Sequence, residues 1–425
     1  MSRQAFTAAN LRRVYRPRRI KHSDAEVRAA ADSAARQIQS GSFSWGRVTN
    51  TIANGSNVFF FKDLPSELVL SKLTMNISRA YNVNPSNRDL IIDQVRTLLT
   101  EQLPFSILTF DIKNFFENID RYRLLRDLDL QLYLSAETRN LLTDLLKNSP
   151  FHRMRGLPRG LPISTPLSEL YLAPLDQRLR QISTVYYYAR FVDDIVIFCS
   201  MDPAKTIEQI HAITEDLRVP LNTKKHRQID IQCPKANGPG QPPPPPCFPT
   251  CKCKETKGFP VHLEYLGYRF NFSSAPNGPS TSKPTPKTVE VTIAQKKIKK
   301  IKTRLARAFV DYTITEDYSL LVDRVRFLTG TFPITRRAAA GRLKGGNHFN
   351  YSRLTDSCAL RELDDFKSRL VYSRRGTLGK RLSPLLTRDQ KNRLARISFQ
   401  YGYANAVLHR FTRRRIYDIK RCFPR

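Results

Sequence analysis

Two adjacent acidic residues, Asp193 and Asp194, lie between two apolar runs, and this pattern is the clearest indication of chemistry in the chain. The aromatic run before them and the Ile, Val and Phe run after them predict two strands joined by a tight turn. Two unpaired carboxylates at one turn repel each other and resist burial. A hard cation such as Mg²⁺, which prefers oxygen ligands, would relieve that repulsion. Taken alone, the pattern also fits an ordinary solvated hairpin.

A third acid, Asp111, lies about eighty residues upstream, after the apolar run 107–110. That run predicts a buried strand ending at Asp111. An acid at the end of this strand, facing the hairpin, would complete a cluster of three carboxylates. Such a cluster can hold two Mg²⁺ ions for in-line displacement at a phosphate. Taken alone, Asp111 could also cap a helix, with Lys113 and Asn114 in its first turn.

Five runs of the chain resemble motifs A to E of reverse transcriptases, in the same order and spacing. They read FDIKNFF at 110–116, GLPRGLPIS at 156–164, FVDD at 191–194, LNTKK at 221–225 and LEYLGY at 263–268. The resemblance covers roughly residues 75–275 and has the character of bacterial retron and group II intron-like enzymes. Two later runs, RFLTG at 326–330 and NHFNY at 347–351, resemble the defence-associated "unknown group" branch of that lineage.

The resemblance implies an α+β fold of the right-hand polymerase type, with fingers, a palm with an antiparallel sheet, a helical thumb and a helical C-terminal extension. The expected divisions are 1–104 for a basic N-terminal extension and fingers, 105–272 for the palm with part of the fingers, 273–335 for the thumb and 336–425 for a basic helical region. Apolar spacing predicts helices over residues 66–77, 86–103, 120–147, 166–180, 206–217 and 292–307.

The resemblance also assigns the metal ligands. Asp111 and Asp193 would bridge two Mg²⁺ ions, with Mn²⁺ as an alternative metal, and Asp194 would complete the cluster. The backbone carbonyl of Ile112 is a further ligand in this prediction. One ion would activate a primer hydroxyl, and the other would neutralise charge on the leaving pyrophosphate.

The predicted substrate contacts come from the same motifs. Phe116 matches the position at which a bulky ring excludes a ribose 2′-hydroxyl, which predicts a DNA product; a core ring is the alternative. Arg88 is the first candidate to hold the triphosphate of an incoming dNTP, against a surface salt bridge, and Lys225 is expected to protonate pyrophosphate or to contact a phosphate. Gly160 would let the backbone approach the template base. Arg159 stands where the family often has Gln, which predicts a restricted template or product composition.

Composition agrees with a polyanionic partner. The 425 residues include 71 Lys and Arg against 37 Asp and Glu, a net charge of +34, and the pI is near 10.2. Such a balance favours nucleic acid, and no apolar run approaches the roughly 20 residues that a membrane span needs. The absence of a signal-like leader and the sparse cysteines lead us to expect a cytoplasmic protein.

A Pro- and Cys-rich insertion is expected at about 231–258. Its four cysteines have a spacing that mostly departs from the pairs typical of zinc sites, so free thiols and a zinc site both stay open; they are Cys233, Cys247, Cys251 and Cys253. A second Pro- and Ser-rich linker is expected at 273–287.

Three functions remain in competition at this point. The first is an RNA-directed DNA polymerase that copies a structured non-coding RNA, with an antiphage role implied by the resemblance alone. The second is a non-catalytic RNA-binding scaffold similar to a maturase. The third is an untemplated or protein-primed DNA polymerase of the abortive-infection type, for which the tyrosines at 186–188 are candidate primers. The sequence leaves the oligomeric state and any partner protein open.

Overall fold

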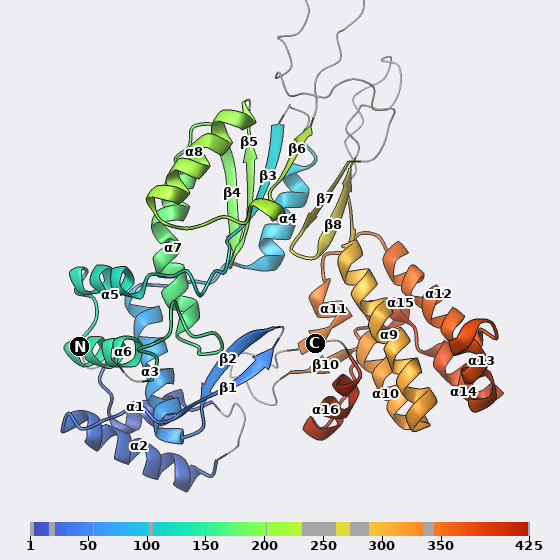
Figure 1. The fold of residues 1–425 in the computed structure, drawn as a ribbon, viewed down its shortest axis with the longest axis horizontal. Helices are drawn as coiled ribbons and strands as arrows, with labels where there is room; N and C mark the ends of the chain where they lie inside the picture. The colour runs from blue at the N-terminus through green and yellow to red at the C-terminus, as the bar shows by residue number, and fades with distance from the viewer. Residues whose placement is uncertain are drawn as a thin grey trace, which may run out of the picture. The chain divides into compact units, whose positions relative to one another are not determined.

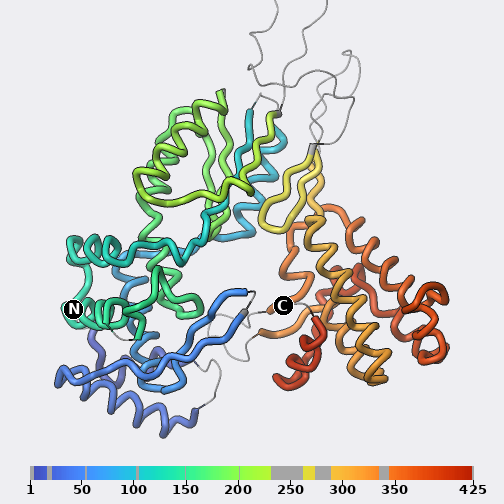
Figure 2. Tube along the Cα trace, in the orientation of Figure 1, coloured from blue at the N-terminus to red at the C-terminus, as the bar shows by residue number. Residues whose placement is uncertain are grey.

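The computed structural model describes residues 4–16, 22–53, 55–101, 105–148, 150–200, 202–231, 261–272, 289–334 and 344–423. The fold is mixed α+β with antiparallel sheets, as predicted (Figures 1 and 2). Contacts divide it into two compact units, Met1–Asn87 with Phe105–Asp230 and Arg88–Pro104 with Ile231–Arg425. The four-part division by sequence stays a prediction, and the contacts place α4 (Arg88–Leu98), expected in the fingers, in the second unit.

The first unit is built on a four-stranded sheet with the order β4-β5-β3-β6. The strands are β3 (Phe105–Asp111), β4 (Val185–Phe191), β5 (Asp194–Cys199) and β6 (Arg227–Ile231). All seven residues of β3 are buried, as a continuous apolar run predicts. Helix α7 (Ser164–Arg180) packs against β4, and α8 (Pro203–Asp216) packs against α7. This sheet carries the acids of interest at the ends of its central strands.

The remaining elements of the first unit are helices, one hairpin and a short 3₁₀ helix outside that sheet. They are α1 (Ala8–Val14), α2 (Asp24–Gln39), the hairpin β1 (Val48–Ala53) and β2 (Ser56–Phe61), α3 (Leu64–Ala80), α5 (Arg121–Leu130), α6 (Ala136–Lys147) and the short 3₁₀ helix η1 (Thr223–Lys225). Leu68, Leu73 and Ile77 place the apolar face of α3 in the core.

The single helix predicted over 120–147 is wrong, because the chain forms two helices there. Leu132 adopts a left-handed conformation with φ of 54°, which ends α5. Ser135 then caps α6 by accepting a hydrogen bond from the backbone N–H of Thr138. The other five predicted helices correspond to α3, α4, α7, α8 and α9.

The second unit combines a three-stranded sheet with a mostly helical remainder. The sheet has the order β7-β8-β9, with β7 (Val261–Tyr265), β8 (Tyr268–Phe272) and β9 (Val289–Ile293). The elements after it are α9 (Gln295–Thr315), α10 (Tyr318–Thr329), β10 (Thr331–Pro333), β11 (Lys344–Gly346), α11 (Asn347–Asn350), α12 (Cys358–Tyr372), α13 (Gly376–Leu385), α14 (Arg388–Arg396), α15 (Phe399–Ala404) and α16 (Arg413–Arg421). Ile298, Ile301 and Leu305 form the buried face of α9, as their spacing predicts.

Two predicted segments cannot be compared with the structure. The insertion at 231–258, apart from Ile231, and the linker at 273–287 lie outside the described residues, and so do the four clustered cysteines. Within the described ranges, every helix is too short or too polar to cross a bilayer.

Candidate active site

The three acids predicted from sequence come together at one end of the central strands. β3 pairs with β5 in antiparallel register, which sets Asp111 directly opposite Asp194. Side chains at opposite positions of such a pair lie close together, with Cβ atoms about 5 Å apart. Asp193 occupies the turn between β4 and β5, and its carbonyl oxygen accepts the Ile112 backbone N–H at 3.0 Å. The backbone pairing therefore brings Asp111, Asp193 and Asp194 to the same end of the two central strands.

Lys225 supplies positive charge to this cluster. Its Nζ donates to Oδ2 of Asp111 at 2.6 Å, and Asn222 Nδ2 donates to Oδ1 at 3.2 Å. The hydrogen bond with Asp111, together with the negative charge of all three acids, raises the pKa of the Lys225 ammonium. Burial and the charge of Asp111 raise the pKa of Asp193. The site therefore has an excess of negative charge, which one ammonium offsets.

A divalent cation fits the chemistry of these donors. Among the described residues, no three acidic, His or Cys side chains are already arranged around one ion position. Asp111 is only 6% exposed, and one of its oxygens accepts a hydrogen bond from Lys225. Carboxylate oxygens are the ligands that Mg²⁺ prefers, and a cation would favour the charged form of Asp193, whose pKa is raised by burial and by the charge of Asp111. Ile112, the predicted backbone ligand, is buried beside Asp111.

The turn that carries Asp193 is strained. Val192 has a φ of 61°, a conformation that a β-branched residue rarely adopts. A two-residue hairpin turn with positive φ at its first position normally has Gly there. Such strain costs on the order of 1–3 kcal/mol and persists only where the surroundings enforce it.

Arg190 is the residue that enforces this turn. One Nη1 hydrogen bond goes to the carbonyl oxygen of Val192 at 3.0 Å. Its other N–H groups bind the carboxylates of Glu169 and Asp176, both on α7, at 2.7 to 3.3 Å. The side chain is only 3% exposed. Burial alone would lower the pKa of Arg190, but hydrogen bonds and charge from Asp176 and Glu169 raise it.

Sequence reasoning missed this network. Tyr188 adds a further hydrogen bond from its hydroxyl to Asp176. The available signal was a charged residue inside a strand that is otherwise aromatic and apolar, because a buried arginine must find carboxylate partners.

Phe116 and Arg159 form a second group on the same unit. The Nε and Nη2 atoms of Arg159 donate to the two oxygens of Glu117 at 2.6 and 2.9 Å. Its guanidinium lies 5.3 Å from the centre of the Phe116 ring. Phe115 is buried while Phe116 is partly exposed, so Phe115 is the core ring of the two. Phe116 is thus held on the surface of the unit, where a substrate could touch it.

At Gly160 the chain passes very close to β2, so the neighbour of this glycine in the structure is protein. Its φ is 92°, and an added Cβ would lie 2.4 Å from the side chain of Val58 and 2.9 Å from the carbonyl oxygen of Phe59. The Phe59 N–H donates to the carbonyl oxygen of Arg159 at 2.7 Å. The motif B loop is therefore fastened to β2, and its contact with a template base stays a prediction.

Arg88 lies in the second unit, where its guanidinium makes hydrogen bonds and an aromatic contact. Its Nη1 donates to the carbonyl oxygen of Asn350 at 2.8 Å, and Nη2 donates to that of Leu266 at 2.5 Å. The guanidinium also lies 4.8 Å from the centre of the Tyr268 ring. These contacts give Arg88 a structural role in the second unit, and its contact with a triphosphate stays a prediction.

Comparison with known proteins identifies the domain. Residues 69–270 match the family described as reverse transcriptase (RNA-dependent DNA polymerase). This stretch, just under half of the chain, is therefore a domain that matches the reverse transcriptases, a family of RNA-directed DNA polymerases and hence of nucleotidyltransferases. The mixed α+β architecture and the helical C-terminal region agree with the predicted right-hand polymerase fold.

No curated protein gives a significant match to the chain. Solved structures do, among them apo telomerase from Candida Tropicalis truncated from its C-terminal domain. That match has a TM-score of 0.33 and 12% sequence identity, and it covers 59% of this chain. The chain spans about half of that telomerase, 48% of its length.

Replacing Arg190 by Ala should strongly destabilise the first unit. The carboxylates of Glu169 and Asp176, each 16% exposed, would lose their buried partner, which costs up to about 3–5 kcal/mol, and R190K should cost less because it keeps the charge. Urea unfolding followed by circular dichroism measures the loss. R178A is the control, because Arg178 pairs with Asp216 at the surface and should cost at most about 1 kcal/mol. Equal losses in R190A and R178A would contradict the role given to Arg190.

Proposed function

We propose that the whole chain is a reverse transcriptase that synthesises cDNA from an associated, structured non-coding RNA. The observation that carries the proposal is the convergence of Asp111, Asp193 and Asp194 inside a domain that matches this enzyme family. Three acids at the end of the two central strands, with Lys225 hydrogen-bonded to Asp111, supply the components of nucleotidyl transfer.

In the proposed reaction, the primer 3′-hydroxyl attacks the α-phosphorus of a dNTP. The new P–O bond forms as the bond to the β-phosphate breaks, and pyrophosphate leaves. Asp111 and Asp193 would hold two Mg²⁺ ions, or Mn²⁺, with Asp194 and the Ile112 carbonyl as further ligands. When bound, the ions would supply Lewis acidity to the hydroxyl and to the leaving group.

Lys225 is the proposed proton donor. Because the acids raise its pKa, the ammonium keeps its proton at neutral pH. In this structure the Lys225 ammonium donates a hydrogen bond to Oδ2 of Asp111 and holds that carboxylate in place. Once released from Asp111, the ammonium can donate to an oxygen of the leaving pyrophosphate.

The choice of deoxynucleotides is assigned to Phe116. Arg159 lies over this ring and is itself fixed by Glu117, so the ring has little freedom to yield to a ribose 2′-hydroxyl. A rigid Arg159 beside the nucleotide is also the feature that supports a restricted template or product composition.

The proposed partner is a structured RNA, and the proposed setting is bacterial antiphage defence in the cytoplasm. Support comes from the net charge of +34 and from the resemblance of 326–330 and 347–351 to defence-associated enzymes. Among the tyrosines proposed as primers, Tyr188 is buried against Asp176, and burial raises the pKa of Tyr187 to about 12. Both are therefore poor nucleophiles, which counts against priming from either.

The acids are tested by single Asp-to-Asn changes at 111, 193 and 194. Each should lower primer extension with Mg²⁺ at least about a thousandfold, which corresponds to about 4 kcal/mol of activation free energy. D230N is the control, because Asp230 lies on the neighbouring strand β6 and accepts a hydrogen bond from Ser106. Wild-type extension by the folded Asp193 and Asp194 variants would instead favour the scaffold alternative.

Changing Phe116 to Ala should relax sugar selection. Removing the ring would reduce the preference for dNTP over rNTP by about 10- to 200-fold, the effect of altering one apolar contact in a pocket. Single-nucleotide incorporation with each substrate measures the ratio. F115L, which shortens the buried side chain in contact with Phe116 but leaves the Phe116 ring itself in place, should alter the ratio much less. An unchanged ratio in F116A would remove the sugar-gate role.

The RNA partner is tested by purification from the native host. We expect one abundant structured RNA to accompany the protein, and cDNA made with all four dNTPs to match part of that RNA. Sequencing both nucleic acids gives the answer. A heterogeneous RNA pool, or DNA attached to a tyrosine and unrelated to any RNA, would contradict this partner and favour the protein-primed alternative.

A further inference from the structure

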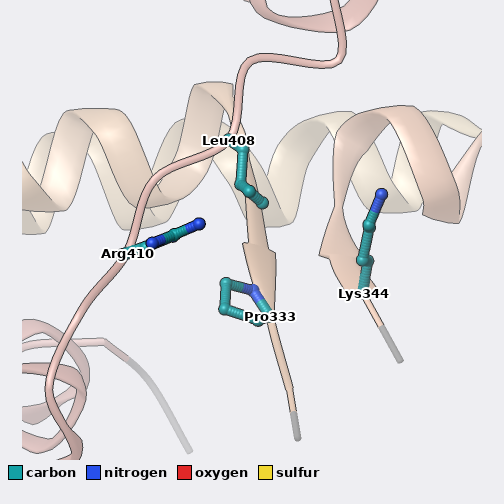
Figure 3. A pocket seen from close by; sticks show the side chains of 4 residues that line it. All are labelled: Pro333, Lys344, Leu408 and Arg410. Atoms are coloured by element: carbon teal, nitrogen blue, oxygen red, sulfur yellow. The ribbon is translucent and has the colours of Figure 1, made fainter. Parts of the chain in front are cut away.

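A separate hollow of about 330 Å³ lies in the second unit. Pro333, Lys344, Leu408 and Arg410 line it, and none of them belongs to the candidate active site (Figure 3). Its volume falls at the lower end of the range found for small-ligand pockets, about 300–1,000 Å³.

Three short backbone segments build the floor of the hollow. β10 pairs antiparallel with β11, which sets Pro333 opposite Lys344. On its other side, Thr331 forms a parallel bridge with Leu408, supported by hydrogen bonds from Thr331 N–H to Val407 O and from His409 N–H to Thr331 O. Because side chains alternate along a strand, Pro333, Lys344, Leu408 and Arg410 emerge on one face.

Glycine is required beside this face. Gly346 is paired with Thr331 and has a φ of 115°, and an added Cβ would lie 2.2 Å from the carbonyl oxygen of Gly330. Thr331, which pairs with Gly346 on one side and bridges to Leu408 on the other, is buried. The three segments therefore pack closely behind the hollow.

The lining combines two cations with an apolar strip. Figure 3 shows Lys344 and Arg410 on opposite sides of Leu408 and Pro333. Leu408 is 42% exposed, and the Lys344 ammonium lies 5.1 Å from the ring of Phe349, which is itself 39% exposed. Among the residues that the structure describes, no carboxylate forms an ion pair with Lys344 or Arg410. Their charge is therefore available to an anion.

We propose that this hollow binds one nucleotide of a single-stranded nucleic acid. The base would lie against the apolar surface of Pro333 and Leu408. Lys344 and Arg410, on opposite sides of that strip, would bind the phosphates that precede and follow the base, and Arg can bind a phosphate with two hydrogen bonds. The site lies on different residues from the catalytic ones, and both RNA and DNA strands have the required chemistry.

The test compares the full-length double variant K344E/R410E with R381E/R388E. The control changes the net charge equally at two exposed arginines on α13 and α14 of the same unit. Binding of fluorescent oligo-uridine and oligo-thymidine is measured over a range of salt concentrations. In K344E/R410E the slope of log affinity against log salt should fall by about 1.4, since each phosphate contact to a single strand contributes about 0.7. The two oligomers show which strand is the natural occupant.

Crosslinking to the wild-type protein provides a second measurement that does not depend on the salt dependence of affinity. A photoreactive thiouridine oligomer should crosslink the wild-type protein at peptides containing Pro333, Phe349 or Leu408, and the crosslinks should disappear in K344E/R410E. Equal slopes in the two double variants, or crosslinks that avoid these peptides, would overturn the proposal. Thermal unfolding of both variants confirms that they fold. Neither readout uses polymerisation, so failure here is distinguishable from failure of the proposed enzymatic activity.

Discussion

Electrostatic repulsion between acids on adjacent strands is the constraint on which the active site depends. Asp111 and Asp194 face each other across β3 and β5, an arrangement of like charges that destabilises a sheet. Asp193 adds a third charge, and burial together with the charge of Asp111 raises its pKa. Lys225 offsets this charge within the protein. A site with this excess of negative charge is chemically suited to a cation and to the phosphates that a cation accompanies.

The same hairpin carries backbone strain that the fold must compensate. Val192 adopts a conformation that favours glycine, and this conformation aims Asp193 at the neighbouring strand. Arg190 fixes the turn because its guanidinium binds both the carbonyl oxygen of Val192 and two carboxylates of α7. A buried ion network of this kind contributes little net stability, but it specifies one geometry because breaking it is costly. The geometry of the turn thus depends on two carboxylates of α7.

The nucleotide side of the site is organised by a different kind of contact. The motif B loop lies so close to β2 that only glycine fits at position 160. Arg159, one residue earlier, then extends to Glu117 and covers Phe116. Motifs A and B, about forty residues apart in sequence, are thereby joined through one charged pair and one ring. The reverse transcriptase match covers both motifs, while the pairing itself is a property of this chain's residues.

The sequence alone determined the features that depend on neighbours along the chain. Alternating and continuous apolar runs predicted the strands that end at Asp111 and begin at Asp194, and apolar spacing predicted five of six helices. The break at Leu132 was missed, because a left-handed leucine has no sequence signal. Tertiary structure decided the rest: the register that sets Asp111 opposite Asp194, the carboxylate partners of Arg190, and the engagement of Arg88 with Leu266 and Asn350. These contacts join residues far apart in sequence, and a hydrogen bond or ion pair forms only where packing has already fixed distance and direction.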